Sequence, residues 1–251
     1  MNAPPQVDAL PLPPSTLLDD ASLFIDFDGT LVELAEQPDA VKVGAPVRSL
    51  VQALHDRYAG RFAIVSGRSI AQLESMLGPV LREMTLACSH GSEQRWAGST
   101  HAPVRAPELD AVAARFHAFA RNHPGTTVEE KSFGVALHYR QAPAAETEAQ
   151  ILGADLAREF DLYLQKGKMV VELRPAGADK GTAIHQLMAR PPMLGTRPVF
   201  LGDDITDEAG FAAVHALGGA GILVGSPRPT AATYRLADPA AVRAWLGEAV
   251  A

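Results

Sequence analysis

Three polar clusters in this chain each follow a short apolar run, and their residue types suit phosphoryl transfer. They are Asp-Phe-Asp-Gly-Thr at residues 26–30, Ser-Gly-Arg at residues 66–68 and Gly-Asp-Asp at residues 202–204. Lys180 and Asp207 add a cation and a further acid. Carboxylates gathered in one place repel each other and need a cation, and ligand sets made only of oxygen favour a hard ion such as Mg²⁺.

The members of these clusters can divide the work of moving a phosphate. Asp26 can attack phosphorus and form an aspartyl-phosphate, and Asp28 can protonate the leaving oxygen and then deprotonate water. Ser66 and Lys180 can hold the phosphate oxygens while Mg²⁺ neutralises developing charge. Each residue alone has a structural alternative, since strand-end aspartates often cap helices and a single lysine is usually a solvated surface residue. Their combination and order favour the catalytic interpretation.

Alternating strands and helices must position these residues. Continuous apolar runs and helical periodicity predict strands at residues 22–26, 61–65, 84–88, 198–202 and 221–224, and helices at residues 47–58, 69–77, 180–190, 207–217 and 242–246. This alternation predicts an α/β fold with a Rossmann-like, doubly wound parallel sheet. In such sheets function gathers at the carboxyl ends of the strands.

The pattern changes after about residue 103. Helices are predicted at residues 108–121 and 144–160, and strands at residues 126–131, 134–140, 162–164 and 169–173, with Gly167 in the turn of the last pair. These elements predict an inserted α+β unit. The expected organisation is a flexible N-terminal arm at 1–20, a core at 21–105 and 175–251, and the insert at 106–174.

Composition sets limits on the partners. The 251 residues carry a formal net charge of -7, which disfavours nucleic acid as a ligand because phosphates need basic excess. The single cysteine, Cys88, cannot form an internal disulfide and is expected to be a buried strand residue. The first 20 residues hold five prolines and read as neither a signal peptide nor a membrane span. We expect a cytoplasmic monomer with a small-molecule substrate and no membrane or nucleic-acid partner.

At the chemistry-bearing segments the chain resembles the haloacid dehalogenase (HAD) superfamily, whose four motifs occur in this order. The resemblance implies that Asp26 is the nucleophile and Asp28 the general acid and base. It implies that Ser66 and Lys180 hold the phosphate. The inserted unit resembles the larger type of HAD cap domain, which closes over the site and sets the choice of substrate.

The same resemblance implies a Mg²⁺ site. The ion would be bound by the carboxylates of Asp26 and Asp203 and by the backbone carbonyl of Asp28. Asp204 and Asp207 would be supporting carboxylates around it.

A narrower resemblance, to trehalose-6-phosphate phosphatases, covers nearly the whole chain after the arm. It is carried by Val-Ser-Gly-Arg at 65–68, Ser-His-Gly-Ser-Glu at 89–93, Ala-Leu-His-Tyr-Arg at 136–140, Val-Glu-Leu-Arg-Pro at 171–175 and Gly-Asp-Asp-Ile-Thr-Asp-Glu at 202–208. The resemblance implies hydrolysis of trehalose 6-phosphate to trehalose and phosphate through an aspartyl-phosphate, in trehalose biosynthesis.

Five polar residues are the implied sugar contacts. Arg68 and Glu93 lie in the core segments, and Lys131, His138 and Glu172 in the insert. A solvated sheet face also explains Lys131 and His138. Glu172 stands inside an apolar run, where an acid without a partner is costly.

Other readings stay open. Another sugar phosphate, such as sucrose phosphate, would share the core and differ in the insert. A signalling receiver module also uses an aspartate, Mg²⁺, a hydroxyl and a lysine, but it needs neither Asp28 nor a lid. A sugar-phosphate sensor that binds without turnover would not need both Asp26 and Asp28.

Overall fold

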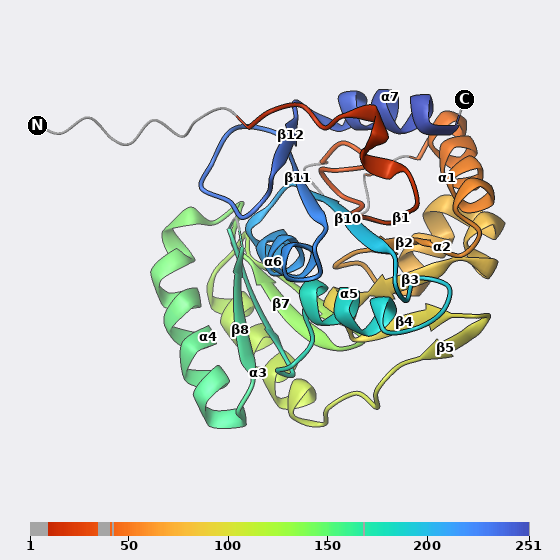
Figure 1. Cartoon of the computed structure of the whole chain (residues 1–251). Coiled ribbons are helices and arrows are strands. Elements are labelled where there is room, and N and C mark those ends of the chain that lie inside the picture. Colours follow the sequence, from red (N-terminus) through yellow and green to blue (C-terminus); the bar gives the residue numbers. More distant parts are fainter. Residues whose placement is uncertain (1–9, 35–40, 42, 168, 251) are drawn as a thin grey trace, which may run out of the picture. The chain divides into compact units, whose positions relative to one another are not determined.

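The computed structural model describes residues 10–34, 41, 43–167 and 169–250. The chain divides into two compact units, residues 1–102 with 179–251, called here the core unit, and residues 103–178, called the inserted unit. The sequence places these boundaries at 105/106 and 174/175, a few residues inside the observed ones. Figure 1 shows the elements of both units, coloured along the chain from red at the N-terminus to blue at the C-terminus.

A mixed sheet forms the centre of the core unit, with eight strands among the described residues in the order β12-β11-β10-β1-β2-β3-β4-β5. The strands are β1 (Ala21–Ile25), β2 (Phe62–Val65), β3 (Thr85–Cys88), β4 (Glu93–Trp96), β5 (Ser99–His101), β10 (Arg197–Gly202), β11 (Ala220–Val224) and β12 (Tyr234–Leu236). All neighbours from β12 to β3 pair in parallel. The predicted Rossmann-like α/β fold is therefore confirmed.

Two strands that the sequence did not predict extend one edge of this sheet, where β4 pairs antiparallel with β3 and β5 with β4. These short strands carry polar residues and lack the apolar run by which buried strands are recognised. Cys88 is fully buried on β3. Burial raises the pKa of its thiol above the ordinary range, as expected for an inert core residue.

Helices cover both faces of the core sheet. They are α1 (Ala45–Tyr58), α2 (Ile70–Leu77), α5 (Lys180–Met188), α6 (Glu208–Ala216) and α7 (Pro239–Val250). Leu23 and Ile25 of β1 pack with α1, α2 and α7 in one apolar cluster. Phe24, between them, packs with α5 and α6 in another. Because both faces of β1 are buried, its sequence is apolar at every position.

Residues 10–20 differ from the predicted flexible arm, whose residues 1–9 lie outside the described part of the chain. A 3₁₀ helix, η1 (Ser15–Leu18), buries Leu17 and Leu18 in the core cluster. The Pro11 carbonyl accepts a 3.0 Å hydrogen bond from the amide of Arg235. This segment is held because its two leucines gain burial against the sheet.

The inserted unit has its own antiparallel sheet, in the order β6-β7-β9-β8. Its elements are α3 (Glu108–Asn122), β6 (Thr127–Lys131), β7 (Gly134–His138), α4 (Glu146–Phe160), β8 (Tyr163–Gly167) and β9 (Val170–Arg174). Leu137 and Val171 are among the side chains that pack against both helices. Gly167, predicted to lie in the turn, ends β8, and the neighbouring Lys168 lies outside the described residues.

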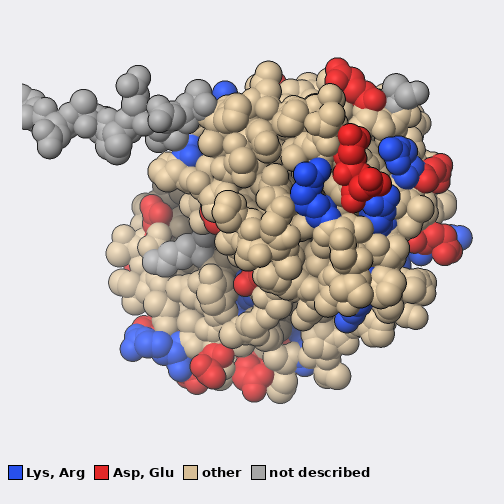
Figure 2. All heavy atoms as spheres, viewed as in Figure 1, with Lys and Arg blue, Asp and Glu red and all other residues tan. Residues whose placement is uncertain are grey.

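Charged side chains of both signs lie near one another on the face shown in Figure 2. Within the part of the chain that the structure describes, no helix has the length and apolar composition that a membrane span requires.

Candidate active site

Asp26 and Lys180 form a buried ion pair at the carboxyl end of β1. Asp26 directly follows the strand and is 5% exposed, and Lys180 opens α5 and is 3% exposed. The Lys180 ammonium lies 2.8 Å from Oδ1 of Asp26 and 2.6 Å from Oδ1 of Asp207. Asp179 caps this helix by accepting from the amide of Thr182 at 2.6 Å, which fixes the start of α5.

The electrostatics of this cluster follow from its burial. Burial raises the pKa of Asp26 well above its ordinary value, and Lys180 opposes that shift. For Lys180, burial favours the neutral amine, but Asp207 and Asp26 outweigh it and raise its pKa, so the ammonium stays charged. Lys180 is therefore a fixed positive charge beside the proposed nucleophile.

Asp207 orients its neighbours. Besides the bond to Lys180, its Oδ2 accepts from the amides of Asp203 and Asp204 at 2.8 and 3.0 Å. Asp204 accepts from the amide of Thr206 at 2.7 Å and caps the 3₁₀ helix η6 (Ile205–Asp207). Both acids thus shape the loop after β10.

A group of three carboxylates can hold a metal ion. Oxygens of Asp26, Asp203 and Asp207 lie within 4.8 Å of one another. Burial, with Asp207 and then Asp204, raises the pKa of Asp203 to about 7. Both oxygens of Asp207 already accept hydrogen bonds. Asp26 and Asp203 are therefore the better metal ligands. A divalent cation with a preference for oxygen would relieve their repulsion.

Gly29 explains how the two loops that carry Asp26 and Asp203 come so close. Its φ of +82° is a left-handed conformation, and an added Cβ would lie 2.2 Å from Oδ2 of Asp203. Thr30 donates a 3.2 Å hydrogen bond to Oδ1 of Asp203. The glycine and threonine of the Asp-Phe-Asp-Gly-Thr segment therefore have structural tasks.

Asp28 is paired with Arg68. The Nε and Nη2 atoms of Arg68 donate to the two carboxylate oxygens at 2.6 and 2.7 Å. Of the two residues, the sequence predicts Asp28 as acid and base and Arg68 as a sugar contact. The structure brings them together within the core unit.

The loop that carries Ser66 packs against residues 89–93. The amide of His90 donates to the carbonyl of Ser66 at 3.1 Å, and a Cβ at Gly67 would lie 2.7 Å from the His90 ring. Glu93, an expected sugar contact, accepts from the amide of Ile70 at 2.7 Å through its Oε2, where α2 begins. In this structure Glu93 satisfies a helix-end donor that would otherwise be unpaired.

The expected sugar contacts of the inserted unit lie on one face of its sheet. Lys131 donates to Glu172 at 2.6 Å, and His138 bonds Glu129 at 3.0 Å. Glu129 pairs with Ala136, and Ala136 pairs with Glu172, in adjacent strands. Glu172 is 7% exposed, so Lys131 is the partner that a buried acid needs.

Two functional candidates are absent from the sequence interpretation. Glu129 stands two residues before Lys131, so the strand period of two was a signal that could have found it. Arg228 donates to the carbonyl of Asp204 at 2.6 Å and pairs with Glu208, which holds the loop after β10. No motif marks Arg228.

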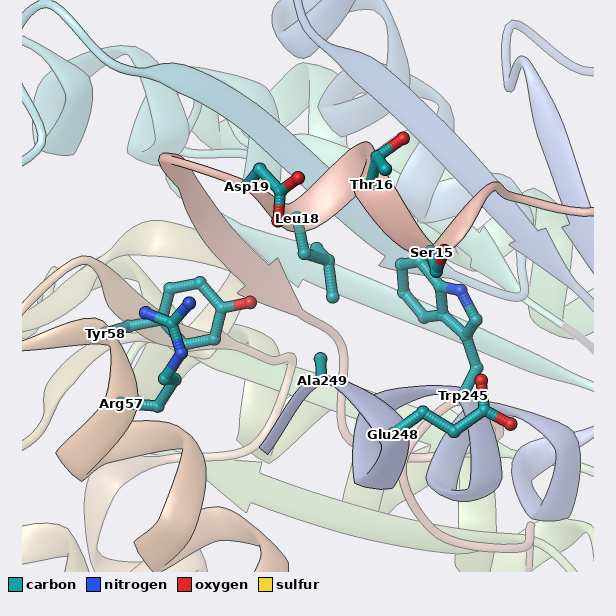
Figure 3. A pocket seen from close by; sticks show the side chains of 9 residues that line it. All are labelled: Ser15, Thr16, Leu18, Asp19, Arg57, Tyr58, Trp245, Glu248 and Ala249. Carbon is teal, nitrogen blue, oxygen red and sulfur yellow. The ribbon is translucent and has the colours of Figure 1, made fainter. Parts of the chain in front are cut away.

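A surface cavity of about 270 Å³ lies away from this chemistry. Figure 3 shows its lining, which includes Asp19, Arg57, Tyr58 and Trp245. Asp19 precedes β1 and Tyr58 precedes β2, so the cavity lies at the amino ends of these strands. None of the predicted site residues lines this cavity. The candidate site lies at the opposite, carboxyl ends of the strands.

Comparison with known proteins assigns the family. Residues 24–240 match the trehalose-phosphatase family. The chain belongs to this family. The trehalose-6-phosphate phosphatase of Escherichia coli strain K12 is 40% identical over 227 residues, which cover 89% of this chain and 84% of that protein.

Solved structures agree with this assignment to the trehalose-phosphatase family. A trehalose-6-phosphate phosphatase related protein has a TM-score of 0.76 at 27% identity, covering 90% of this chain and 95% of the other. A haloacid dehalogenase-like hydrolase from Bacteroides thetaiotaomicron has a TM-score of 0.65 at 15% identity, covering 90% of this chain and 98% of the other. The second likeness concerns the fold alone. The predicted resemblance and HAD-like fold are confirmed.

Proposed function

We propose that this protein is a Mg²⁺-dependent phosphatase that hydrolyses trehalose 6-phosphate to trehalose and phosphate, in trehalose biosynthesis. One observation carries the proposal: this chain of the trehalose-phosphatase family has a buried cluster of Asp26, Lys180 and further acids at the end of β1. Asp28, two residues after Asp26, disfavours a receiver module or a non-catalytic sensor, since neither needs a general acid.

The reaction proceeds in two displacements at phosphorus. An Asp26 oxygen attacks, the bond between phosphorus and the sugar oxygen breaks, and Asp28 gives that oxygen its proton. Water then attacks the aspartyl-phosphate, Asp28 takes the proton of the water, and phosphate leaves with Asp26 restored. At the end of the cycle Asp26 is again a free carboxylate and Asp28 again carries its proton, so the net reaction consumes one water.

The remaining core residues bind the phosphate and stabilise its negative charge. The Lys180 ammonium is near Asp26 before the reaction begins, and Ser66 offers a hydroxyl to a phosphate oxygen. Asp26 and Asp203, with the carbonyl of Asp28, would hold Mg²⁺, which supplies charge neutralisation at the transferring group. Asp204 and Asp207 support this set through the loop after β10.

Sugar choice is assigned to the polar sheet face of the inserted unit. Glu172 accepts and Lys131 and His138 donate, which matches the needs of sugar hydroxyls. A site built to bond hydroxyls rejects sugars that lack them, because its own polar groups are then unpaired. Glu129 belongs to the same face. Glu93 would add a contact from the core unit, although it also accepts from the amide of Ile70. Arg68, the other core residue expected to bind sugar, directs its guanidinium to Asp28.

A panel of phosphate esters tests the substrate assignment. With Mg²⁺ present, kcat/KM for phosphate release should be highest with trehalose 6-phosphate. It should be lower by at least about tenfold with sucrose 6-phosphate and with glucose 6-phosphate. A higher kcat/KM for sucrose 6-phosphate would replace the sugar assignment and keep the core chemistry. Binding without release of phosphate from any ester would indicate a sensor.

Mg²⁺ is expected to stabilise the protein more at about pH 8 than at about pH 5.5. In the metal-free fold the pKa of Asp203 is raised to about 7 from its ordinary 3.8. Between pH 3.8 and about pH 7, the folded state therefore keeps a proton that the unfolded chain has lost. The stability of the metal-free protein falls as pH rises through this range. The metal replaces that proton, so it competes with protons only at the lower pH.

Thermal unfolding with and without Mg²⁺ at both pH values measures this difference. The Asp203→Asn variant is the control. Adding Mg²⁺ should raise its Tm only slightly at either pH. An equal gain for the unmodified protein at both values would contradict the proposed ligand set.

We also propose that the enzyme acts as a monomer in the cytoplasm. Sedimentation equilibrium and cell fractionation test the two statements separately.

A further inference from the structure

We propose that Arg68 is a positioning residue, which holds the Asp28 carboxylate where it takes the proton of the attacking water. Arg68 thus acts through Asp28 and not by binding sugar. The inference rests on the proposed function, because Asp28 is the acid and base of that reaction.

The geometry of the pair fixes the carboxylate in both place and orientation. Nε donates to Oδ2 at 2.6 Å and Nη2 donates to Oδ1 at 2.7 Å, so both oxygens of Asp28 are engaged by one planar guanidinium. The side chains of Arg68 and Asp28 are 11% and 26% exposed. Such a two-bond arrangement specifies the rotation of the carboxylate as well as its distance, which a lysine cannot do.

Arg68 is itself anchored. Its amide donates to Oγ of Ser66 at 3.1 Å, and its carbonyl accepts from the amide of Ser89 at 2.8 Å. The next residue, Ser69, caps α2 in a reciprocal pair of bonds with Gln72. A residue fixed on both sides in this way can serve as a rigid support for Asp28.

The backbone on the other side of the pair is also fixed. The amide of Gly29 donates to the carbonyl of Val32 at 2.8 Å, and Asp28 and Val32 form a β-bridge. The turn therefore holds the Asp28 backbone, while the guanidinium determines where its carboxylate points. Loss of the guanidinium frees only the side chain.

The two chemical steps depend differently on Asp28. A sugar oxygen is a poor leaving group and needs the proton that Asp28 delivers. Nitrophenolate leaves without that help, so its release reports the attack of Asp26 on phosphorus. Hydrolysis of the aspartyl-phosphate needs Asp28 as base whichever ester was used. A misplaced Asp28 should therefore let the intermediate accumulate from an aryl ester.

Stopped-flow kinetics with p-nitrophenyl phosphate and the Mg²⁺-loaded protein test the proposal. Arg68→Lys should lower steady-state kcat on the order of 10²-fold, since displacements of about 1 Å have effects of this size. A burst of nitrophenol should precede the slow phase. With trehalose 6-phosphate, kcat should fall and KM should change little.

A matched control is the pair of Arg95 with Glu74, at 2.8 Å with Arg95 13% exposed. Arg95→Lys should leave kcat unchanged and show no burst. If Arg68→Lys unfolds, Arg68→Gln retains part of the hydrogen-bonding capacity and is tested in its place.

A double-mutant cycle separates action through Asp28 from direct contact with substrate. On an Asp28→Asn background, Arg68→Lys should change the slow-phase rate by less than about twofold. An equal fold-loss in both backgrounds, or a raised KM for trehalose 6-phosphate with no burst, would overturn the proposal. Aryl phosphatase activity that survives Asp26→Asn would instead overturn the proposed function.

Discussion

Asp26→Asn is expected to lower the turnover of trehalose 6-phosphate by at least about four orders of magnitude, because loss of a covalent nucleophile has effects of this size. The amide is a poor nucleophile toward phosphorus and cannot form the aspartyl-phosphate. The fold should survive. Burial raises the pKa of Asp26, so its charge is costly there, and Asp207 still pairs with Lys180.

The measurement is phosphate release under Mg²⁺ saturation, with Tm as a check on folding. Asp56→Asn is the control, since Asp56 lies on the exposed face of α1, where it accepts a 2.8 Å hydrogen bond from Gln52. It should keep full activity. Turnover of the Asp26→Asn protein within tenfold of normal would remove Asp26 from the mechanism.

Glu172→Ala is expected to reduce kcat/KM for trehalose 6-phosphate strongly and to change hydrolysis of p-nitrophenyl phosphate little. Glu172 is 7% exposed and bonds Lys131 at 2.6 Å. Removing one member of a buried charged pair costs about 2–5 kcal/mol at interfaces. This range corresponds to roughly 30- to 5,000-fold in rate. The aryl ester has no sugar hydroxyls for this face to recognise.

Kinetics with both esters check this prediction against a matched variant. Glu130→Ala removes a neighbouring acid of β6 that pairs with His117 at 2.9 Å and is half exposed. It should leave both activities unchanged. Equal proportional losses for the two esters in Glu172→Ala would make Glu172 a structural residue of the inserted unit.

The elements that carry the catalytic residues were predictable because both faces of their strands are buried. In β1, Leu23 and Phe24 face different apolar clusters, and this burial makes the strand apolar throughout and visible in the sequence. The acids that follow such strands meet at one edge by the geometry of a parallel sheet. The gathering of Asp26 and Asp203 follows from this rule. Lys180 opens α5 and meets Asp26 through the packing of that helix.

Features decided by tertiary contacts were not predictable. β4 and β5 form at the sheet edge and have little apolar patterning. Glu93 is an acid of a family motif, yet its observed bond is to the amide of Ile70, and only the fold brings these residues together. Arg228 reaches the carbonyl of Asp204 from a loop 24 residues away. Leu17 and Leu18 follow prolines, which concealed their burial.

The most direct test of the central claim is rapid acid quench of the Mg²⁺-loaded enzyme with trehalose 6-phosphate labelled in its phosphate. The peptide that contains Asp26 should carry the label within the first turnover, and the label should pass to free phosphate no more slowly than kcat. The Asp26→Asn protein should remain unlabelled. Phosphate release at the normal rate with no label on Asp26, or label on another residue, would contradict the account.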